Sequence, residues 1–320
     1  MSPRALIPVP VMLAVLAGVP TPTLAAVEKA PGKGLDASSL PLAAPGGDVA
    51  YLTRHGKRKT RLLETPRDGG PALRALRIPG SFALPAVAHD GLPGGLSADG
   101  RTLMLVNPRR RFPRANTTLA VVDPRRMRLR RQIRLRGDFS FDAISPDGRL
   151  LYLIQYLSKR DITDYAVRAY DMRARRLFRQ PVVDPREPEE DMSGEPLSRV
   201  MDAAGRWAYT LYASEEHPFV HALDTEQRTA VCIDLEIHGG EALAMRGDRL
   251  DVLGGGRVLA SIDTSTHRVI AGPAKRRAQR TPATEEAAGF PWLLIVGPTA
   301  VLILLAAAGR RRSATPTAAP

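Results

Sequence analysis

The chain is poor in several residue types, and each scarcity narrows what the protein can be. One cysteine, Cys232, excludes an internal disulfide. There are only two asparagines, Asn107 and Asn116, and lysine is so rare that nearly all of the 46 basic residues are arginines. This skew, together with 28 prolines, is typical of codon usage in GC-rich bacteria. An abundance of arginine alone therefore does not indicate a binding surface.

Sequence motifs with a catalytic mechanism are also missing. The chain has no P-loop, no Gly-x-Ser-x-Gly, no His-Glu-x-x-His and no cysteine spacing that would hold a metal. Its triple glycine, 254–256, lies in a predicted turn between strands and not before a helix, so it is not a phosphate cradle. We therefore predict no catalytic residues, no cofactor and no bound metal.

The two ends of the 320-residue chain carry apolar segments of different length. Arg4 precedes a short apolar run and then small residues, which is typical of a secretory signal peptide over 1–26. Residues 289–308 carry no charge, and as a helix they would span about 30 Å, the thickness of the hydrocarbon core. Three arginines follow at 310–312. The positive-inside rule then predicts a plasma-membrane protein with one membrane span, most of the chain outside the cytoplasm and a cytoplasmic C-terminus.

Between these ends a strand–turn–strand unit recurs. Its clearest copy runs from Phe141 to Ile154, where Pro146, Asp147 and Gly148 have the backbone preferences of a tight turn. Four strands in about 45 residues is the period of a propeller blade, and no helical periodicity interrupts the pattern. The turn glycines and the aspartates that end strands after them are Gly100, Gly148, Gly205 and Gly247, and Asp123, Asp171, Asp224 and Asp263.

The segment Leu119–Gly137, followed by the Ser-Pro-Asp-Gly-Arg-Leu-Leu-Tyr-Leu run at 145–153, resembles the YVTN-type β-propeller repeat of secreted bacterial proteins. Asn107 stands at the asparagine position of that repeat, whereas Gln155 and Tyr212 replace it in the next two copies. The resemblance implies an all-β fold and a secreted or membrane-anchored propeller. Because propellers host many activities, it does not indicate a function.

The resemblance covers about 85–272, and a degenerate strand pair lies in 49–80. We expect about five blades, four recognisable and one degenerate, with six as the alternative and with an N-terminal strand closing the last blade. The predicted segments are a signal peptide (1–26), a flexible segment (27–48), the propeller (49–272), a polar stalk (273–288), a transmembrane helix (289–308) and a cytoplasmic tail (309–320).

A concentration of arginines marks one predicted strand and the loop before it. An anionic polymer or lipid surface would be attracted to such a patch. Charges on an exposed edge strand also prevent edge-to-edge pairing, so both interpretations stay open. The strand arginines share one face and the others lie in the loop; the predicted patch consists of Arg109, Arg110, Arg111, Arg128, Arg130, Arg134 and Arg136.

The remaining polar groups favour structural roles. Aspartates at a constant place after a strand are expected to cap turns. The acidic loop 184–195 could ligate calcium through oxygens, but it lacks EF-hand spacing and also fits a solvated loop. His217 and His221 are four apart beside a strand, which separates them by about 13 Å and is too far for one ion.

These features favour a cell-surface propeller that acts as a binding platform for a protein, a glycan or an anionic envelope ligand. One alternative is a propeller enzyme of the lactonase or quinoprotein type. Lactonase-like sites typically need a Glu/Asn/Asp metal set, and this chain has few asparagines. The other alternative is a receptor ectodomain that works through a membrane partner, because the predicted tail is too short to be a domain. Nucleic acid is not expected outside the cytoplasm.

Overall fold

The computed structural model describes residues 35–188, 193–214 and 217–272. In this part of the chain all regular elements are strands, which confirms the all-β prediction. The strands form four sheets of four strands, one sheet of three and one ribbon of two. Among the described residues, none forms a helix of the length and apolarity that a membrane span requires. The predicted signal peptide, stalk, transmembrane helix and tail lie outside the described residues.

Each larger sheet is an antiparallel meander whose strands are neighbours in the order of the chain. The first contains β2 (Leu42–Ala43), β3 (Val49–His55), β4 (Lys59–Pro66) and β5 (Arg74–Pro79). The second contains β7 (Leu103–Val106), β8 (Asn116–Asp123) and β9 (Arg128–Arg136). The third contains β10 (Phe139–Ile144), β11 (Leu150–Tyr156), β12 (Tyr165–Asp171) and β13 (Arg176–Pro181).

The last two sheets repeat this plan, and a short ribbon joins the N-terminal segment to the start of the second sheet. The fourth sheet contains β14 (Glu195–Met201), β15 (Trp207–Ala213), β16 (Phe219–Asp224) and β17 (Thr229–Asp234). The fifth contains β18 (Ala242–Arg246), β19 (Arg249–Gly254), β20 (Arg257–Asp263) and β21 (Arg268–Ala271). The ribbon pairs β1 (Ala37–Ser38) with β6 (Leu84–Pro85).

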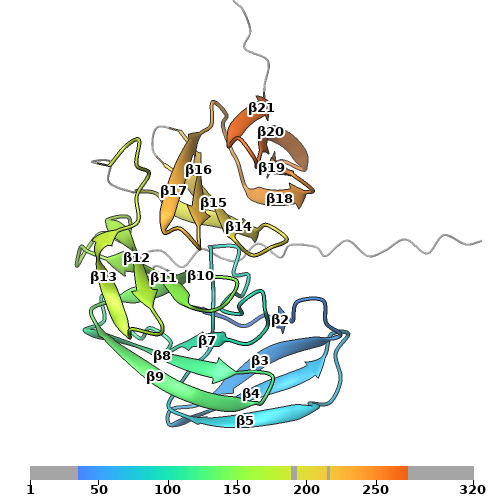
Figure 1. Cartoon of the computed structure of the whole chain (residues 1–320), viewed down its shortest axis with the longest axis vertical. Coiled ribbons are helices and arrows are strands. Elements are labelled where there is room, and N and C mark those ends of the chain that lie inside the picture. The colour runs from blue at the N-terminus through green and yellow to red at the C-terminus, as the bar shows by residue number, and fades with distance from the viewer. Residues whose placement is uncertain (1–34, 189–192, 215–216, 273–320) are drawn as a thin grey trace, which may run out of the picture. The chain divides into compact units, whose positions relative to one another are not determined.

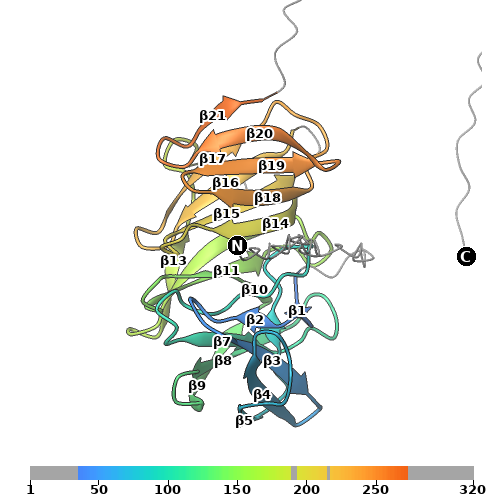
Figure 2. The same ribbon diagram turned by 90° about the vertical axis from the view of Figure 1, so that its right-hand side faces the viewer.

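The sheets follow one another around a common centre. In Figure 1 the first strand of each meander lies toward that centre and the last strand lies at the rim, and β14 contacts β18 across two neighbouring sheets. Turned by 90°, the molecule shows the sheets as successive layers from β2–β5 to β18–β21 (Figure 2). Successive four-stranded meanders that pack face to face around a centre are the architecture of a β-propeller.

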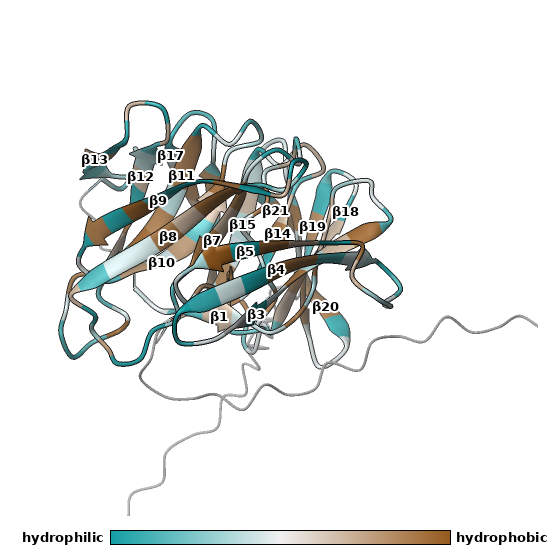
Figure 3. Ribbon diagram, turned by 90° about the horizontal axis from the view of Figure 1, so that it is seen from below, coloured by the Kyte–Doolittle hydropathy of each residue, from teal (hydrophilic) through white to brown (hydrophobic). Residues whose placement is uncertain are grey.

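Apolar side chains fill the space between successive sheets. Strand β11 shows how, because its alternate residues enter different clusters. Leu151 and Leu153 belong to the cluster shared with β7–β9, whereas Tyr152 packs with Leu223 of the fourth sheet. A strand buried on both faces reads as a continuous apolar run, which explains the sequence Leu-Leu-Tyr-Leu-Ile. Figure 3 shows hydrophobic colour along the strands and hydrophilic colour on many of the turns.

The predicted tight turns are confirmed. Gly148 has φ +69°, and its N–H donates to the carbonyl of Ser145 at 2.9 Å. Oδ1 of Asp147 accepts from the backbone N–H of Arg149 at 2.9 Å and closes the turn. A Cβ at Gly148 would lie 2.5 Å from Oγ1 of Thr102, so the turn also packs tightly against the previous sheet. The corresponding glycines also have positive φ: Gly100, Gly205 and Gly247.

The strand-ending aspartates are turn caps, as predicted. Oδ1 of Asp263 accepts from the hydroxyl of Ser265 at 2.6 Å and from the N–H groups of Thr266 and Ser265 at 2.8 and 2.9 Å, and these hydrogen bonds lower the pKa of Asp263 to about 2. The residue four positions after each aspartate has a left-handed backbone, which the sequence did not indicate because none of these residues is glycine. These residues are Met127, Arg175, Arg228 and His267.

Three predictions about the N-terminal part of the fold are wrong. Residues 27–48 were expected to be flexible, yet from Leu35 onward the chain is built into the fold: Ala37 pairs with Pro85, and Leu42 pairs with Tyr51. Strand β2 belongs to its own sheet with β3–β5, so it does not complete the last sheet, and the first sheet has four strands rather than a degenerate pair. Strands β1 and β2 have two residues each, too few to show the alternation of apolar and polar residues that indicates a strand. The prediction therefore relied on the proline, glycine and alanine content of the segment, which is typical of a flexible chain.

Candidate anion-binding site

The arginine-rich strand is the outer strand of its sheet. Strand β9 pairs only with β8 in the described sheet, and it lies at the rim of the molecule in Figure 1. Its arginines Arg128, Arg130, Arg134 and Arg136 are exposed. The predicted edge strand is correct, but its one-sided arrangement is wrong, because the register shifts at Arg130 and Leu129 packs in a different cluster from Ile133. Arg128 and Arg134 therefore leave the strand on opposite faces. Arg110 and Arg111 are also exposed, in the loop between β7 and β8.

A groove of about 630 Å³ lies between β9 and the turns of the third sheet. Only one carboxylate, that of Asp147, is among the residues lining it. Three of the arginines that line it are residues of β9, and three are residues of the third sheet that the predicted patch did not include. The six arginines that line the groove are Arg130, Arg131, Arg134, Arg149, Arg173 and Arg175.

Three of these guanidinium groups have protein partners. Nη2 of Arg130 lies 3.0 Å from Oδ2 of Asp123, and Nη2 of Arg131 donates to the carbonyl of Met172. Arg149 is 3.8 Å from Asp147, and both side chains are largely exposed. An ion pair that is exposed to solvent in this way contributes little to stability.

The other three guanidinium groups lack such partners. Within the described residues, no hydrogen bond or ion pair joins the side chains of Arg134, Arg173 or Arg175 to another group. The described part of the protein therefore does not neutralise the positive charges of these three side chains.

The floor of the groove is rigid. Val121, Ile133, Tyr170 and Met172 line it, and each is buried in the protein core. Burial raises the pKa of Tyr170, and the nearby guanidinium groups of Arg131 and Arg175 partly oppose that rise. Charges from β9 and from the β12–β13 turn thus act on one phenol.

Arg109, which we predicted to be part of the exposed patch, is buried, so that assignment is wrong. Its side chain is only 1% exposed and pairs with Asp138, whose side chain is also 1% exposed. The two groups form a bidentate contact, with Nη2 to Oδ1 at 2.7 Å and Nε to Oδ2 at 3.0 Å. This side chain cannot reach a ligand on the surface.

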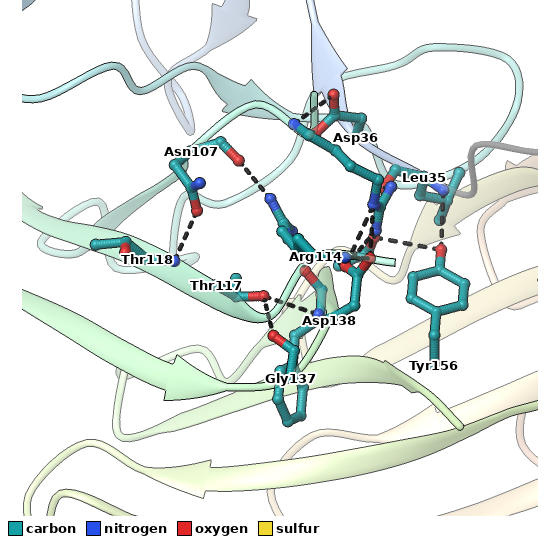
Figure 4. A network of polar contacts seen from close by, with 12 residues as sticks. Leu35, Asp36, Asn107, Arg114, Thr117, Thr118, Gly137, Asp138 and Tyr156 are labelled. Carbon is teal, nitrogen blue, oxygen red and sulfur yellow. Dashed lines mark hydrogen bonds and ion pairs between the residues drawn. The ribbon is translucent and has the colours of Figure 1, made fainter. Parts of the chain in front are cut away.

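A second buried arginine shares the same carboxylate (Figure 4). Nε of Arg114 donates to Oδ1 of Asp138 at 3.0 Å, and its backbone N–H donates to Oδ2 at 2.9 Å. Burial acts to lower the pKa of Arg109, but the bonds to Asp138 more than offset it and raise that pKa. Burial and the neighbouring Arg109 charge lower the pKa of Arg114.

The N-terminal segment closes this cluster. The N–H of Leu35 donates to the hydroxyl of Tyr156 at 2.9 Å, and Nη1 of Arg109 donates to the Leu35 carbonyl at 2.7 Å. The carboxylate of Asp36 accepts from the backbone N–H of Arg109 at 2.7 Å. The cluster ties the N-terminal segment to the second and third sheets, and every contact in it is internal. Its role is structural.

The structure describes both histidines of the predicted pair but only residues 184–188 and 193–195 of the acidic loop. His217 is exposed, whereas His221 is buried in β16, so they do not share a surface. In the described residues one group of ligand atoms lies within 4.8 Å: those of Asp184, Glu187 and Cys232. Arg186 donates to both oxygens of Asp184. Burial opposes ionisation there, but the bonds from Arg186 hold the pKa of Asp184 at about 2, so the carboxylate already has its cation.

A further buried polar cluster joins the third and fourth sheets. Arg199 of β14 donates to Oδ1 and to the carbonyl of Asp142 on β10, and its Nε donates to Oγ1 of Thr210 at 2.8 Å. Thr210 is the cross-strand neighbour of His221. Burial lowers the pKa of His221 to about 4. Sequence reasoning missed this cluster because its members lie in four different strands.

Comparisons with known proteins give a likeness in fold and no family. No protein-family model matches the chain, and no curated protein matches it. Three solved structures have TM-scores of 0.44: hydrazine synthase of Kuenenia stuttgartiensis, the Cps50 (Swd1) β-propeller domain of Myceliophteria thermophila and TolB of Acinetobacter baumannii. Their identities are 13%, 14% and 13%, and they cover 76%, 72% and 72% of this chain.

The chain spans 68%, 67% and 53% of those three proteins, respectively. Likenesses at this level assign neither an activity nor a ligand to the chain. The propeller assignment rests on the observed order and packing of the sheets.

Proposed function

We propose that this chain is a membrane-anchored binding protein whose extracytoplasmic domain is a five-bladed propeller of YVTN type. In this proposal the five larger sheets are the blades, the segment 289–308 is the anchor and the basic groove binds an anionic ligand of the cell envelope. The proposal assigns no catalytic step to the protein. The apolar segments at both ends of the sequence and the arginines at 310–312 support the placement.

The observation that carries the binding function is the collection of guanidinium groups around one groove. Arg134, Arg173 and Arg175 have no ion-pair partner among the described residues, and Asp147 is the one carboxylate that lines the groove. Exposed charges farther apart than about 8 Å are screened at physiological salt. Charges gathered in one depression therefore retain attraction for an anion where scattered charges would not.

A rigid floor favours binding. Tyr170, Met172 and Val121 are fixed in the core, so the groove does not have to form when the ligand arrives. Arginine adds geometric selectivity because its planar fork donates two parallel hydrogen bonds to one oxyanion. These features describe a platform that recognises charge and shape.

The binding function is tested by replacing the four exposed arginines of β9 with glutamine: Arg128, Arg130, Arg134 and Arg136. Wild-type and variant proteins are passed over purified anionic wall polymer and over anionic vesicles across a salt series. We expect the variant to elute at clearly lower salt, because fewer phosphate or carboxylate contacts are made. Elution of both proteins at the same salt concentration would show that the charges only protect a solvated edge.

The placement is tested separately. A protease added to intact, wall-stripped cells should cleave the predicted extracytoplasmic part and leave the C-terminus after residue 308 protected. Resistance of residues 60–270 in intact cells, with cleavage only after lysis, would contradict the proposed topology.

A further inference from the structure

The first sheet carries a row of like charges across three neighbouring strands. Arg54 of β3 lies directly opposite Arg61 of β4, and Arg61 lies directly opposite Arg77 of β5. Residues that are opposite in this way share one face of the sheet, with Cβ atoms about 5 Å apart. All three side chains are exposed, and within the described ranges none of them bonds to another group. Because like charges directly opposite one another are destabilising, the row does not serve the stability of the sheet.

The turn that joins β3 to β4 adds three more cations at the same end of the sheet. Lys57 and Arg58 lie in the turn and Lys59 begins β4, and all three side chains are exposed. Backbone bonds hold the turn: the Gly56 N–H donates to the Lys59 carbonyl at 2.9 Å, and the Gly80 N–H donates to the Arg58 carbonyl at 2.8 Å. Two of the chain's six lysines lie here, so a preference for arginine codons does not explain this turn.

Strand β9 of the second sheet brings two further cations. Its register with β8 places Gln132, Arg134 and Arg136 on one face, because no shift occurs between them. That face is turned toward the first sheet, since Nε2 of Gln132 donates to the carbonyl of Pro79 at 2.8 Å. Both arginines are exposed, and the described part of the chain supplies no partner for their side chains.

Two contacts show where the β9 arginines lie along the first sheet. Nη1 of Arg74, at the start of β5, donates to the carbonyl of Arg125 just before β9 at 2.8 Å. Pro79, at the end of β5, contacts Gln132 within β9. The two strands therefore advance in the same direction, and the residues after Gln132 lie toward the end of β5. Pro79 is also the cross-strand neighbour of Lys59, so the β9 arginines lie at the end of the sheet that carries the turn.

The carboxylates of the first sheet lie away from these cations. Glu64 is bonded to Arg74, and Asp48 and Asp68 flank β3 and β4 at the end opposite the turn. The charge at the turn is therefore not offset within its own sheet. We call this surface the basic end, and it consists of Arg54, Lys57, Arg58, Lys59, Arg61, Arg77, Arg134 and Arg136.

The spread of the basic end favours an extended ligand over a compact one. Neighbouring strands are about 4.8 Å apart, so the row from Arg54 to Arg77 alone extends about 10 Å, and the turn and β9 lengthen it. No residue of the first sheet lines the groove between β9 and the third sheet, so this surface is separate from that groove. A small anion reaches a few of the cations at a time, whereas a chain with repeated charges contacts many of them at once.

The apolar residues favour a polymer over a lipid surface. Among the described residues of the first sheet and its turns, the only large apolar side chain that is exposed is Leu73, just before β5 and at the end opposite the turn. Peripheral binding to a membrane is strengthened by apolar side chains that enter the bilayer. The basic end offers charge without such side chains, which suits a hydrated polymer.

We propose that the basic end is a docking surface for a linear polyanion, a polymer with a negative charge on each repeat. This inference rests on the proposed anionic-ligand function and gives it a second surface and a ligand shape. The polymer lies along the row of the first sheet and across the turn to β9. Repeated carboxylates and repeated phosphates both present this chemistry, and arginine forks accept either group.

The test uses the full-length chain in nanodiscs of neutral phosphatidylcholine. The labelled probes are long poly-L-glutamate and long polyphosphate, each compared with its trimer at equal charge concentration, and fluorescence anisotropy measures binding. Flotation with phosphatidylglycerol vesicles tests a lipid surface. Three triple variants remove the same number of exposed cations. The tip variant is Lys57→Gln, Arg58→Gln and Lys59→Gln; the groove variant is Arg149→Gln, Arg173→Gln and Arg175→Gln; the remote variant is Arg160→Gln, Arg257→Gln and Arg268→Gln.

We expect at least one long polymer to bind the wild type about tenfold or more tightly than its trimer, because only the polymer contacts many cations together. The tip variant should lose about tenfold or more in affinity for that polymer, which is one charge-assisted contact or more. The remote variant should lose less than about threefold, the effect of distant, screened charge. The polymer that binds identifies the repeating group. If the tip variant unfolds at a lower temperature, Lys57→Gln with Arg58→Gln replaces it, because both residues lie outside the strands.

Other results would overturn the inference and can be told apart from failure of the proposed function. Equal losses in the tip and remote variants, or equal affinity for polymer and trimer, would mean that the chain responds to net charge without a docking surface. A loss in the groove variant alone would leave the proposed function in place and remove the basic end from it. Flotation that depends on the tip residues, without binding of either polymer, would assign the surface to lipid. Absence of wild-type binding to every anionic material would remove the proposed function itself.

Discussion

Two groups of arginines lie within thirty residues of each other in the sequence and have opposite environments. Arg109 and Arg114 are buried and share Asp138, whereas Arg134 on β9 is exposed and has no ion-pair partner in the described chain. A guanidinium is structural where a carboxylate from another element reaches it, and it is available to a ligand where none does. Arginine content alone therefore does not locate a binding surface.

The geometry of Asp138 explains why the first group is stable. It lies between β9 and β10 and accepts bonds from two side chains and one backbone N–H, so both of its oxygens are fully used. Burial of charge is tolerated only where pairing and hydrogen bonding are this complete. On β9 the guanidinium groups remain in water and need no such compensation.

The largest expected effect comes from breaking the buried group. Asp138→Asn keeps the shape of the side chain but removes the carboxylate charge that the buried Arg109 and Arg114 share. We expect a loss of about 3–5 kcal/mol in the free energy of unfolding, the usual cost of an uncompensated buried charge. Urea denaturation of the purified chain measures it.

The matched control for that experiment is Asp147→Asn, which removes an exposed carboxylate next to Arg149. Its unfolding free energy should stay within about 0.5 kcal/mol of the wild type, as for most surface changes. If Asp138→Asn were as mild as this control, the buried group would not be the structural element that its contacts indicate.

The next effect concerns the margin of the groove. Gly148→Val places a β-branched side chain at φ +69° and a Cβ 2.5 Å from Thr102 Oγ1. Strain and overpacking together predict a destabilisation of about 2–3 kcal/mol. Thermal unfolding measures it, with Gly247→Val as the control, because Gly247 shares the left-handed backbone but has open space around it. Equal effects in both variants would show that contact with Thr102 is unimportant.

A pH experiment extends the comparison to the other buried arginine, Arg199, which lies near His221. Burial lowers the pKa of His221 to about 4, so the unfolded chain binds a proton more readily than the folded chain. The free energy of unfolding should therefore have its full value above the ordinary histidine pKa and should decrease as the pH falls toward 4. Because of His221, the free energy of unfolding should be about 2 kcal/mol lower at about pH 5 than at about pH 7.5.

The variant His221→Gln should have a smaller decrease in stability over that pH range than the wild type, measured by urea denaturation at each pH. His217→Gln is the control because His217 is exposed, and it should follow the wild type. Parallel curves for all three proteins would mean that His221 is not buried in its neutral form.

The smallest effect is expected at the exposed arginines. Arg128→Gln and Arg134→Gln should each change the unfolding free energy by less than about 0.5 kcal/mol, because neither side chain is packed in the core. Differential scanning calorimetry at low and high salt measures it. A large loss of unfolding free energy at either position would show that the arginine is structural. It would also weaken the contrast between the buried arginines and the exposed arginines of β9.

Local patterns predicted much of the fold. The turn at Gly148 and the caps at Asp123 and Asp263 were correct, because each depends on residues that are close in sequence. The one-sided arginines of β9 were wrong, because a bulge at Arg130 shifts the alternation of the strand. The failures were Leu35, Ala37 and Arg109, whose positions depend on partners far away: Leu35 bonds to Tyr156, and Ala37 pairs with Pro85. A sequence does not display such partners.

The sequence by itself determined the strand order, the turn chemistry and the presence of a basic strand, since alternation and turn preferences act over a few residues. Only the tertiary structure decided which arginines are buried and which face a ligand. The packing of the second sheet against the third brings Asp138 to Arg109, and it brings Arg131 and Arg175 to one groove. Electrostatic environment depends on distance in space, so the same residue type becomes a core ion pair in one place and a candidate binding group in another.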